Sequence, residues 1–278
     1  MSIQLRLFYL FFALLLGTAS VGAAESKSVS FVNAQGIRIT AHLFHSNWSG
    51  ARPTVVMMHG CAGIYSLSDP SKGLAKLYLE WGARLTQNGY HALLVDSFTA
   101  RGTAQNQCGN GSAGVSEVSD RPLDAYAAAR WLVKRPEVNA QALALLGWSH
   151  GGSSVFAAMS ETAVDGKSPF FQSAFAFYPG CGLYNAFGGT STSTYVPYAP
   201  LLILHGSADP LYQSGYCQSR LANAQLLTTN RFMEIIAYPS AKHSFDNARA
   251  LDANWTIYDV NAKTSADAEI MNRLGYLR

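Results

Sequence analysis

The chain has 278 residues, of which 49% are apolar and 13% are charged, and its formal net charge at pH 7 is +3. This apolar content can bury a sizeable core, and the length suits one large α/β domain better than two small ones. The small positive charge is not accompanied by a cluster of basic residues, which nucleic-acid binding needs. We therefore expect no nucleic-acid partner.

The first 24 residues have the pattern of a secretory signal peptide. Arg6 precedes an apolar run from Leu7 to Leu16, and small residues end the segment at Ala24. The run is too short for a spanning helix with a stop-transfer pattern, although an uncleaved membrane anchor is the alternative. We therefore predict a signal peptide over 1–24, one domain over 25–278, and a secreted or periplasmic protein with no stable membrane association after cleavage.

Eight short segments predict the strands of a sheet, and helical stretches separate most of the last six. The first two segments, joined through Gln35 and Gly36, predict an antiparallel hairpin, whereas the others are typical of strands buried on both faces. This alternation predicts an α/β fold with a mostly parallel sheet, in which ligands bind outside the carboxyl ends of the strands. The predicted strands are 28–32, 37–44, 54–58, 91–95, 142–146, 173–177, 201–204 and 233–237, and the predicted helices are 73–88, 122–134, 152–161 and 213–228.

The segment from Gly147 to Gly151 joins the fifth predicted strand to a helix and has the pattern G-x-S-x-G. A serine on such a sharp turn needs a positive φ, and the neighbouring chains must approach closely. Gly147 and Gly151 lack the side chains that would collide there. The pattern therefore predicts a nucleophile elbow with Ser149 as the nucleophile, and the alternative is a plain turn with small residues for packing.

Two further strand ends carry the partners that a serine nucleophile needs. Asp209 follows the strand 201–204 and could orient a histidine, or it could only cap the turn before Pro210. His243 follows the last predicted strand and is the only histidine after Asp209. The order Ser149, Asp209, His243 is one of the known orders of a serine triad, so we predict these three residues as catalytic.

The loop after the strand 54–58 predicts an oxyanion hole. Its glycines can turn the N–H of Cys61 into the site, where it would act with the N–H of His150, the residue after the nucleophile. The alternative for this loop is a plain strand-to-helix turn. The other histidines are expected to be structural, with His59 and His205 hydrogen-bonded to backbone near the sheet edge.

All four cysteines lie in the predicted exported part, where disulfides persist, and they allow three pairings. We predict a bond between Cys181 and Cys217, because they lie above neighbouring strand ends. Cys61 and Cys108 then pair or stay free. The absence of C-x-x-C and H-E-x-x-H patterns indicates neither a zinc site nor a dithiol redox motif.

Taken together, these segments resemble the dienelactone hydrolase family of α/β-hydrolases, in its exported branch with a serine nucleophile. The resemblance extends over about 55–246 and implies the α/β-hydrolase fold. The matching segments are 59–63, 96–102, 124–126, 147–152, 178–181, 205–209 and 243–246.

The chain also departs from the family pattern. The name-giving enzymes use a cysteine where this chain has Ser149, and they carry a glutamate where this chain has Gly60 and Cys61, which argues against dienelactone itself as the substrate. Arg101 resembles a family arginine that binds a substrate carboxylate, with the spacing shifted by one residue. It could instead pair with an acid such as Asp120 or with loop carbonyls. Trp148 and Tyr65 complete the predicted substrate contacts.

We therefore predict a serine hydrolase that cleaves carboxylic ester or lactone bonds of small molecules through an acyl-enzyme, without a metal or organic cofactor. A short insert before Pro200 contains four aromatic residues and predicts an open, aromatic-rimmed cleft, which would also suit a cutinase-like polyester hydrolase. A non-catalytic binding module on the same fold is the alternative from another class. The oligomeric state stays open. The aromatic residues are Tyr184, Phe187, Tyr195 and Tyr198.

Overall fold

The computed structural model describes residues 25–66, 69–103, 108, 114–163, 171–227, 233–248 and 258–277. The predicted signal peptide therefore lies outside the described residues. Within these ranges, no helix has both the length and the apolar content needed to cross a bilayer.

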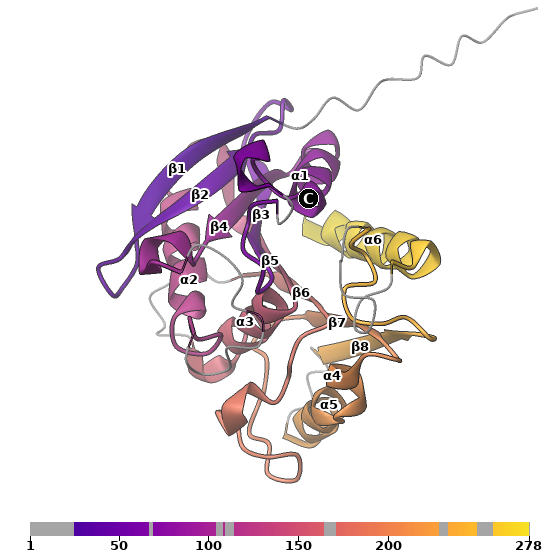
Figure 1. Ribbon diagram of the computed structural model, residues 1–278. Helices are drawn as coiled ribbons and strands as arrows, with labels where there is room; N and C mark the ends of the chain where they lie inside the picture. Colours follow the sequence, from indigo (N-terminus) through magenta and orange to yellow (C-terminus); the bar gives the residue numbers. More distant parts are fainter. Residues whose placement is uncertain are drawn as a thin grey trace, which may run out of the picture.

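All eight predicted strands form, and they belong to one sheet (Figure 1). The strand order is β1-β2-β4-β3-β5-β6-β7-β8. β2 pairs antiparallel with β1 and β4, and the remaining neighbours are parallel, as predicted. The strands are β1 (Ser26–Val32), β2 (Arg38–Phe44), β3 (Arg52–Met58), β4 (His91–Asp96), β5 (Val138–Trp148), β6 (Ser173–Phe177), β7 (Leu201–Gly206) and β8 (Met233–Tyr238).

Helices cover both faces of the sheet. Figure 1 shows α1 and α6 beside each other on one side, whereas α2 and α3 lie on the other, where α5 also packs. The helices are α1 (Lys76–Gln87), α2 (Arg121–Leu132), α3 (His150–Ala158), α4 (Pro210–Gln213), α5 (Tyr216–Leu227) and α6 (Val260–Leu274). Short 3₁₀ turns are η1 (Pro70–Lys72), η2 (Thr99–Arg101), η4 (Glu161–Ala163), η5 (Leu183–Asn185) and η6 (Gly275–Leu277).

Strand β3 shows why the central strands are continuously apolar in sequence. Val56 and Met58 pack into the core under α2 and α3, whereas Val55 and Met57 pack into the core under α1 and α6. All four side chains are fully buried. A parallel strand covered on both faces has no solvated side, so it needs apolar residues at every position.

The C-terminal helix α6 was not predicted from the sequence. Its buried residues Ala262, Ala266, Ile270 and Leu274 recur every fourth position, which places them on one helix face. The side chain of Asp259 accepts hydrogen bonds from the N–H groups at the start of the helix. The capping residue Asp259 and the four-residue spacing of the apolar positions are therefore the sequence signals that could have predicted α6.

Candidate active site

The elbow between β5 and α3 has the backbone geometry that the pattern predicts. Ser149 has φ 51° and ψ −115°, and its N–H donates to the carbonyl of Phe177 at 2.9 Å. A Cβ on Gly147 would lie 2.4 Å from the carbonyl oxygen of Gly151, and one on Gly151 would lie 2.1 Å from that of Met58. Because no side chain fits at either distance, only glycine permits this turn.

His243 and Asp209 lie in line with the serine. The Nε2 atom of His243 is 2.9 Å from Ser149 Oγ, and its Nδ1 atom is 2.7 Å from Asp209 Oδ2. The other oxygen of Asp209 accepts the N–H of Leu211 at 2.9 Å and caps α4. The two roles considered for Asp209 are therefore compatible, because each uses a different carboxylate oxygen.

Asp209 is fully buried beside two imidazoles. Burial alone would raise its pKa, but the contacts with His205 and His243 outweigh burial and hold the pKa of Asp209 below its ordinary value. His205 Nδ1 lies 3.3 Å from Oδ2 without good hydrogen-bond alignment, so we treat this contact as electrostatic. Its Nε2 is 3.2 Å from the carbonyl of Pro179, as expected for a backbone-bonded histidine.

The loop after β3 lies against the elbow. A Cβ on Gly60 would be 3.9 Å from the Cβ of Ser149, and the Gly60 N–H donates to Tyr78 Oη at 3.0 Å. Within the part of the chain that the structure describes, the N–H of Cys61 has no hydrogen-bond acceptor. His150 opens α3, so its N–H has no acceptor within the helix. The N–H groups of Cys61 and His150 therefore stay the candidate oxyanion donors.

Two residues at this site, Arg121 and Glu117, were not predicted to take part in the chemistry. Arg121 Nη1 lies 2.7 Å from His150 Nδ1, and Nη2 donates to the carbonyl of His59 at 2.7 Å. Glu117 Oε2 lies 3.6 Å from His150 Nε2 and accepts the hydroxyl of Tyr184 at 3.1 Å. Arg121 and Glu117 fall outside every motif, so a single sequence offered no sign that they reach the site.

The electrostatics around His150 follow from burial. Burial, with the charge of Arg121, lowers the pKa of His150 to about 3, so the ring is neutral at working pH. Burial also raises the pKa of Glu117. The imidazole of His150 therefore lies between a cation and a carboxyl without being charged itself.

Arg101 has a different place from the one that the resemblance implied. Its Nη1 is 2.8 Å from Asp124 Oδ2, its Nη2 is 3.1 Å from Oδ1, and Nη1 also donates to the carbonyl of Ser97 at 2.7 Å. Asp124 is fully buried. Because this two-point pair already neutralises the guanidinium, Arg101 belongs to the scaffold, with Asp124 rather than Asp120 as its partner.

Trp148 lies beneath the nucleophile rather than in a cleft. It is only 1% exposed, stacks on Phe177, and donates its indole N–H to Asp246 at 2.9 Å. We therefore correct its predicted substrate contact to a packing role. Tyr65 is half-buried, with contacts to His42 and a backbone bridge to Leu74.

The predicted aromatic rim is also mostly core. Tyr195 is fully buried and stacks on Phe156 of α3 at 3.8 Å, and Phe187 packs on both rings. Tyr184, which is 54% exposed, is the member of the group that faces solvent. The insert is therefore folded back onto α3.

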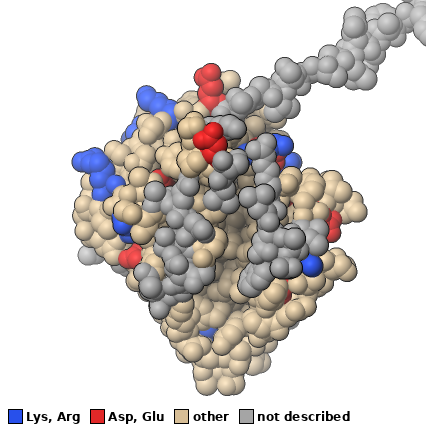
Figure 2. Space-filling view, in the orientation of Figure 1, with Lys and Arg blue, Asp and Glu red and all other residues tan. Residues whose placement is uncertain are grey.

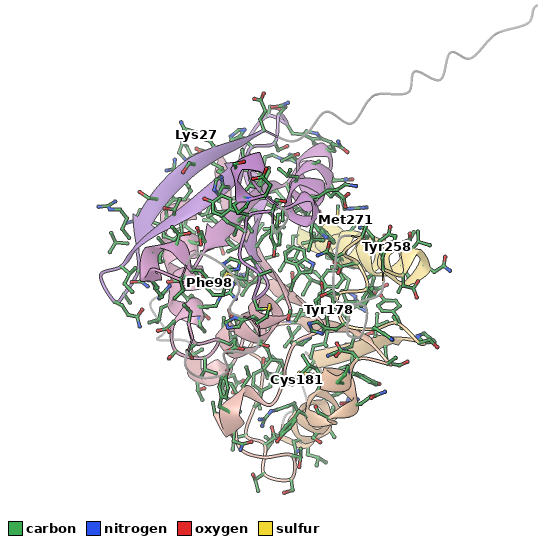
Figure 3. All side chains as sticks on the ribbon, in the orientation of Figure 1. Lys27, Phe98, Tyr178, Cys181, Tyr258 and Met271 are labelled. Atoms are coloured by element: carbon green, nitrogen blue, oxygen red, sulfur yellow. A yellow bond between two sulfur atoms is a disulfide. The ribbon has the colours of Figure 1, made fainter. Side chains whose placement is uncertain are left out.

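Phe98 and Tyr178, both labelled in Figure 3, pack against His150 and His243, respectively. Phe98 contacts His150 edge to face at 5.6 Å, whereas the ring of Tyr178 lies 4.7 Å from that of His243. Tyr178 also donates its hydroxyl to Asp246 at 2.6 Å. Burial raises the pKa of Asp246 to about 6.

Two disulfides support the loops around the site. The predicted bond between Cys181 and Cys217 is confirmed. Cys61 and Cys108 form the second bond, which ties the predicted oxyanion loop to the segment after β4. The position of Cys61 is therefore held by a covalent cross-link as well as by the turn.

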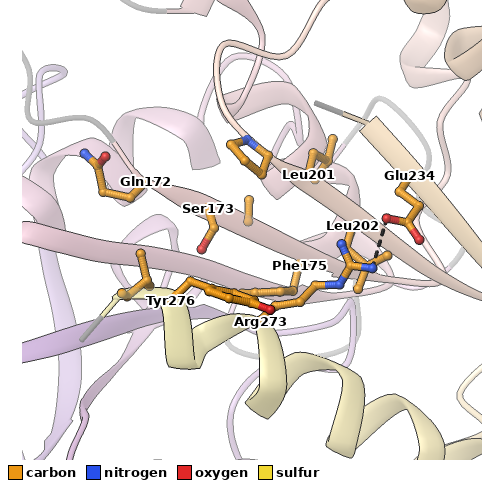
Figure 4. A pocket seen from close by; sticks show the side chains of 11 residues that line it. Gln172, Ser173, Phe175, Leu201, Leu202, Glu234, Arg273 and Tyr276 are labelled. Carbon is orange, nitrogen blue, oxygen red and sulfur yellow. Dashed lines mark ion pairs between the residues drawn. The ribbon is translucent and has the colours of Figure 1, made fainter. Parts of the chain in front are cut away.

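A cavity of about 500 Å³ lies at the other end of the sheet, near the starts of β6, β7 and β8 (Figure 4). Arg273 and Glu234 form an ion pair at 2.9 Å across it, and no triad residue lines it. Figure 2 instead shows a hollow near the centre of the view, in front of β5 and β6, with charged side chains scattered thinly around it.

Residues 39–276 match the family model of the dienelactone hydrolase family. The chain belongs to the dienelactone hydrolase family. The match confirms the family that the motifs indicated, without reference to its exported branch. A curated relative, the uncharacterized protein YfhR of Escherichia coli O157:H7, is 26% identical over 199 residues, and the match spans 66% of this chain and 63% of that protein.

Solved structures agree on the fold. A dienelactone hydrolase-like promiscuous phosphotriesterase, P91 from metagenomic libraries, is 19% identical with a TM-score of 0.68, and the match covers 92% of this chain and 99% of that one. Esterase 2 of Thermogutta terrifontis, solved phosphorylated by paraoxon, is 17% identical with a TM-score of 0.61, covering 92% and 96%. At these identities the likeness shows the α/β-hydrolase fold alone.

Proposed function

We propose that this member of the dienelactone hydrolase family is a serine hydrolase that cleaves carboxylic ester bonds, including lactones. Membership of the family supports a hydrolase that acts on esters. The observation that carries the proposal is the line of contacts from Ser149 Oγ through His243 to Asp209, with distances of 2.9 and 2.7 Å. These are the distances that a nucleophile and its base require.

The proposed reaction proceeds through an acyl-enzyme. His243 takes the proton of Ser149 as the hydroxyl oxygen attacks the acyl carbon, and Asp209 holds the imidazole and stabilises its charged form. The N–H groups of Cys61 and His150 stabilise the oxyanion. His243 then protonates the leaving alcohol, and water repeats the sequence to release the acid. No observation favours a polyester substrate or a non-catalytic binder.

A fluorophosphonate probe tests this proposal. We expect the wild-type protein to be labelled at Ser149, and Ser149→Ala to abolish both labelling and hydrolysis of a p-nitrophenyl ester. His243→Ala is expected to lower kcat by about 10⁴ or more, because the triad acts as a unit. Folded wild-type protein that escapes labelling would indicate a binding module. A p-nitrophenyl ester panel over acyl length and charge would define the substrate.

We also propose that the protein is secreted or periplasmic. Its two disulfides support an oxidising compartment. Sequencing of the exported protein is expected to give Glu25 as the first residue, and an intact N-terminus in the membrane fraction would indicate an anchor instead.

A further inference from the structure

Arg121, the first residue of α2, is a fully buried cation. Burial lowers its pKa to about 10, so it stays charged at neutral pH. The nearby carboxylates Asp124 and Glu117 contact Arg101 and His150 instead, and no carboxylate among the described residues forms an ion pair with Arg121. A buried charge without an ion-pair partner is costly, which calls for a reason beyond packing.

The two hydrogen bonds of Arg121 reach two separate chain segments. Nη2 donates to the carbonyl of His59 at 2.7 Å, and Nη1 lies 2.7 Å from His150 Nδ1. A guanidinium can only donate, so Nδ1 accepts and the proton of the neutral His150 ring lies on Nε2. The ring of Phe98, 5.2 Å below the guanidinium carbon, supports the plane of the fork.

These two segments are the ones that supply the proposed oxyanion donors. His59 is two residues before Cys61, and His150 carries the second N–H itself. One planar guanidinium group therefore bridges the loop after β3 and the start of α3. It also places a fully buried positive charge in contact with both segments.

We propose that Arg121 is a positioning residue for the oxyanion hole, which holds the two N–H donors at the spacing that the transition state requires. This inference rests on the proposed function. Oxyanion donors act mainly where negative charge develops, so misplacing them lowers kcat while substrate binding is preserved. Loss of a residue that served only the stability of the fold would not lower kcat selectively while leaving KM unchanged.

Arg220 is a matched control. It is 1% exposed and also donates several hydrogen bonds, for example to the carbonyls of Cys181 and Phe187. Among the described residues, the partners of its side-chain hydrogen bonds lie in the segment 181–193, outside the loop after β3 and the elbow. Removing it tests the loss of a buried arginine without touching the oxyanion donors.

The experiment compares Arg121→Met, Arg121→Lys and Arg220→Met with the wild type. For each, kcat and KM on a p-nitrophenyl ester, the rate constant for fluorophosphonate labelling, and Tm are measured. Arg121→Met is expected to lower kcat and the labelling rate by about 100-fold with KM within about threefold. Arg121→Lys keeps the charge but donates from a single nitrogen instead of a two-point fork, and it should recover about tenfold of that loss. Arg220→Met should lower Tm with kcat within about threefold.

Three outcomes would overturn the proposal. They are an equal fall in kcat for Arg121→Met and Arg220→Met at matched loss of Tm, a rise in KM with kcat unchanged, or full activity of Arg121→Lys. If Arg121→Met does not fold, Arg121→Lys decides, because it retains the buried charge but not the two-point fork. Failure of the proposed function is recognised separately, since wild-type Ser149 would then not be labelled at all.

Discussion

The position of Ser149 depends on the glycines on either side of it, because they allow the sharp turn of the elbow. Its φ of 51° is strained for a residue with a side chain, and α3 must pass within contact of the end of β3 for the turn to close. Gly151 is the point of closest approach, because a Cβ there would meet the carbonyl oxygens of Met58 and His59 at 2.1 and 2.4 Å. Both are backbone atoms at a strand end, so they cannot move aside cheaply.

Gly151→Ala is therefore expected to destabilise the fold by about 3 kcal/mol and to abolish esterase activity, because α3 must shift away from β3. Gly275→Ala is the control, since a Cβ there meets nothing within 4 Å. Urea denaturation and ester hydrolysis measure the two effects. A Gly151→Ala protein with wild-type stability and rate would contradict the close approach.

Asp209→Asn tests the orientation of the histidine at constant shape. An amide nitrogen cannot accept the Nδ1 proton of His243, so the imidazole is expected to lose its orientation and tautomer. We expect kcat to fall by about 10³ to 10⁴, somewhat less than for loss of the serine, with a near-native circular dichroism spectrum. Retention of a tenth of the wild-type rate would remove Asp209 from the triad.

At the scale of elements, the two disulfides close loops of similar length but differ in their relation to the proposed oxyanion hole. The sequence separations are 47 residues for Cys61–Cys108 and 36 for Cys181–Cys217. Loops of these lengths differ by only about 0.2 kcal/mol in closure entropy, so each bond should contribute about 2 to 4 kcal/mol to stability. Only the first bond includes a residue whose N–H is proposed to contact the oxyanion.

Replacing both cysteines of each bond by serine is expected to separate stability from catalysis. Both double variants should lose similar free energies of unfolding, whereas kcat should fall about tenfold only when Cys61 and Cys108 are replaced. Loss of Cys181 and Cys217 should leave kcat within about threefold. Equal kcat values for the two variants would show that the cross-link has no part in placing the oxyanion donor.

For the whole molecule, buried histidines dominate the expected pH dependence of stability. Burial lowers the pKa values of His42, His59, His91 and His150, the last to about 3. Below about pH 6.5 the unfolded chain binds protons that the folded protein does not, so the free energy of unfolding rises with pH up to about 6.5. His150 alone accounts for roughly 5 kcal/mol of this rise.

Asp246 acts in the opposite direction, because burial raises its pKa to about 6. Between about pH 4 and 6 the folded state binds this proton more tightly than the unfolded state, so its contribution to stability falls by about 3 kcal/mol as the pH rises. Asp209 has a lowered pKa and is ionised in both states across this window. Its own contribution is lost only at lower pH.

Asp246→Asn is therefore expected to steepen the rise of stability between pH 4 and 6. The slope is the quantity to compare, because the substitution also changes the hydrogen bonds from Trp148 and Tyr178. Urea denaturation followed by tryptophan fluorescence at four pH values measures it. Parallel curves for variant and wild type would contradict a raised pKa for Asp246.

The sequence by itself determined the features that depend on local chemistry. Short apolar runs predicted six of the eight strands, because a strand covered on both faces has no solvated side, and the first two were predicted as a hairpin. The glycines around Ser149 specified the elbow, because only glycine tolerates the approach of backbone at those positions. The acid and the histidine were found because the carboxyl ends of parallel strands meet at one edge.

Only the tertiary structure decided which polar groups face one another. Arg101 and Arg121 are both arginines in loops or helix starts after β4, yet one is neutralised by Asp124 and the other spans His59 and His150. These contacts join segments that lie far apart in the sequence, so no local pattern encodes them. Burial likewise moved Trp148 and Tyr195 from a predicted cleft to the core, because an aromatic side chain has the same sequence signature in both places.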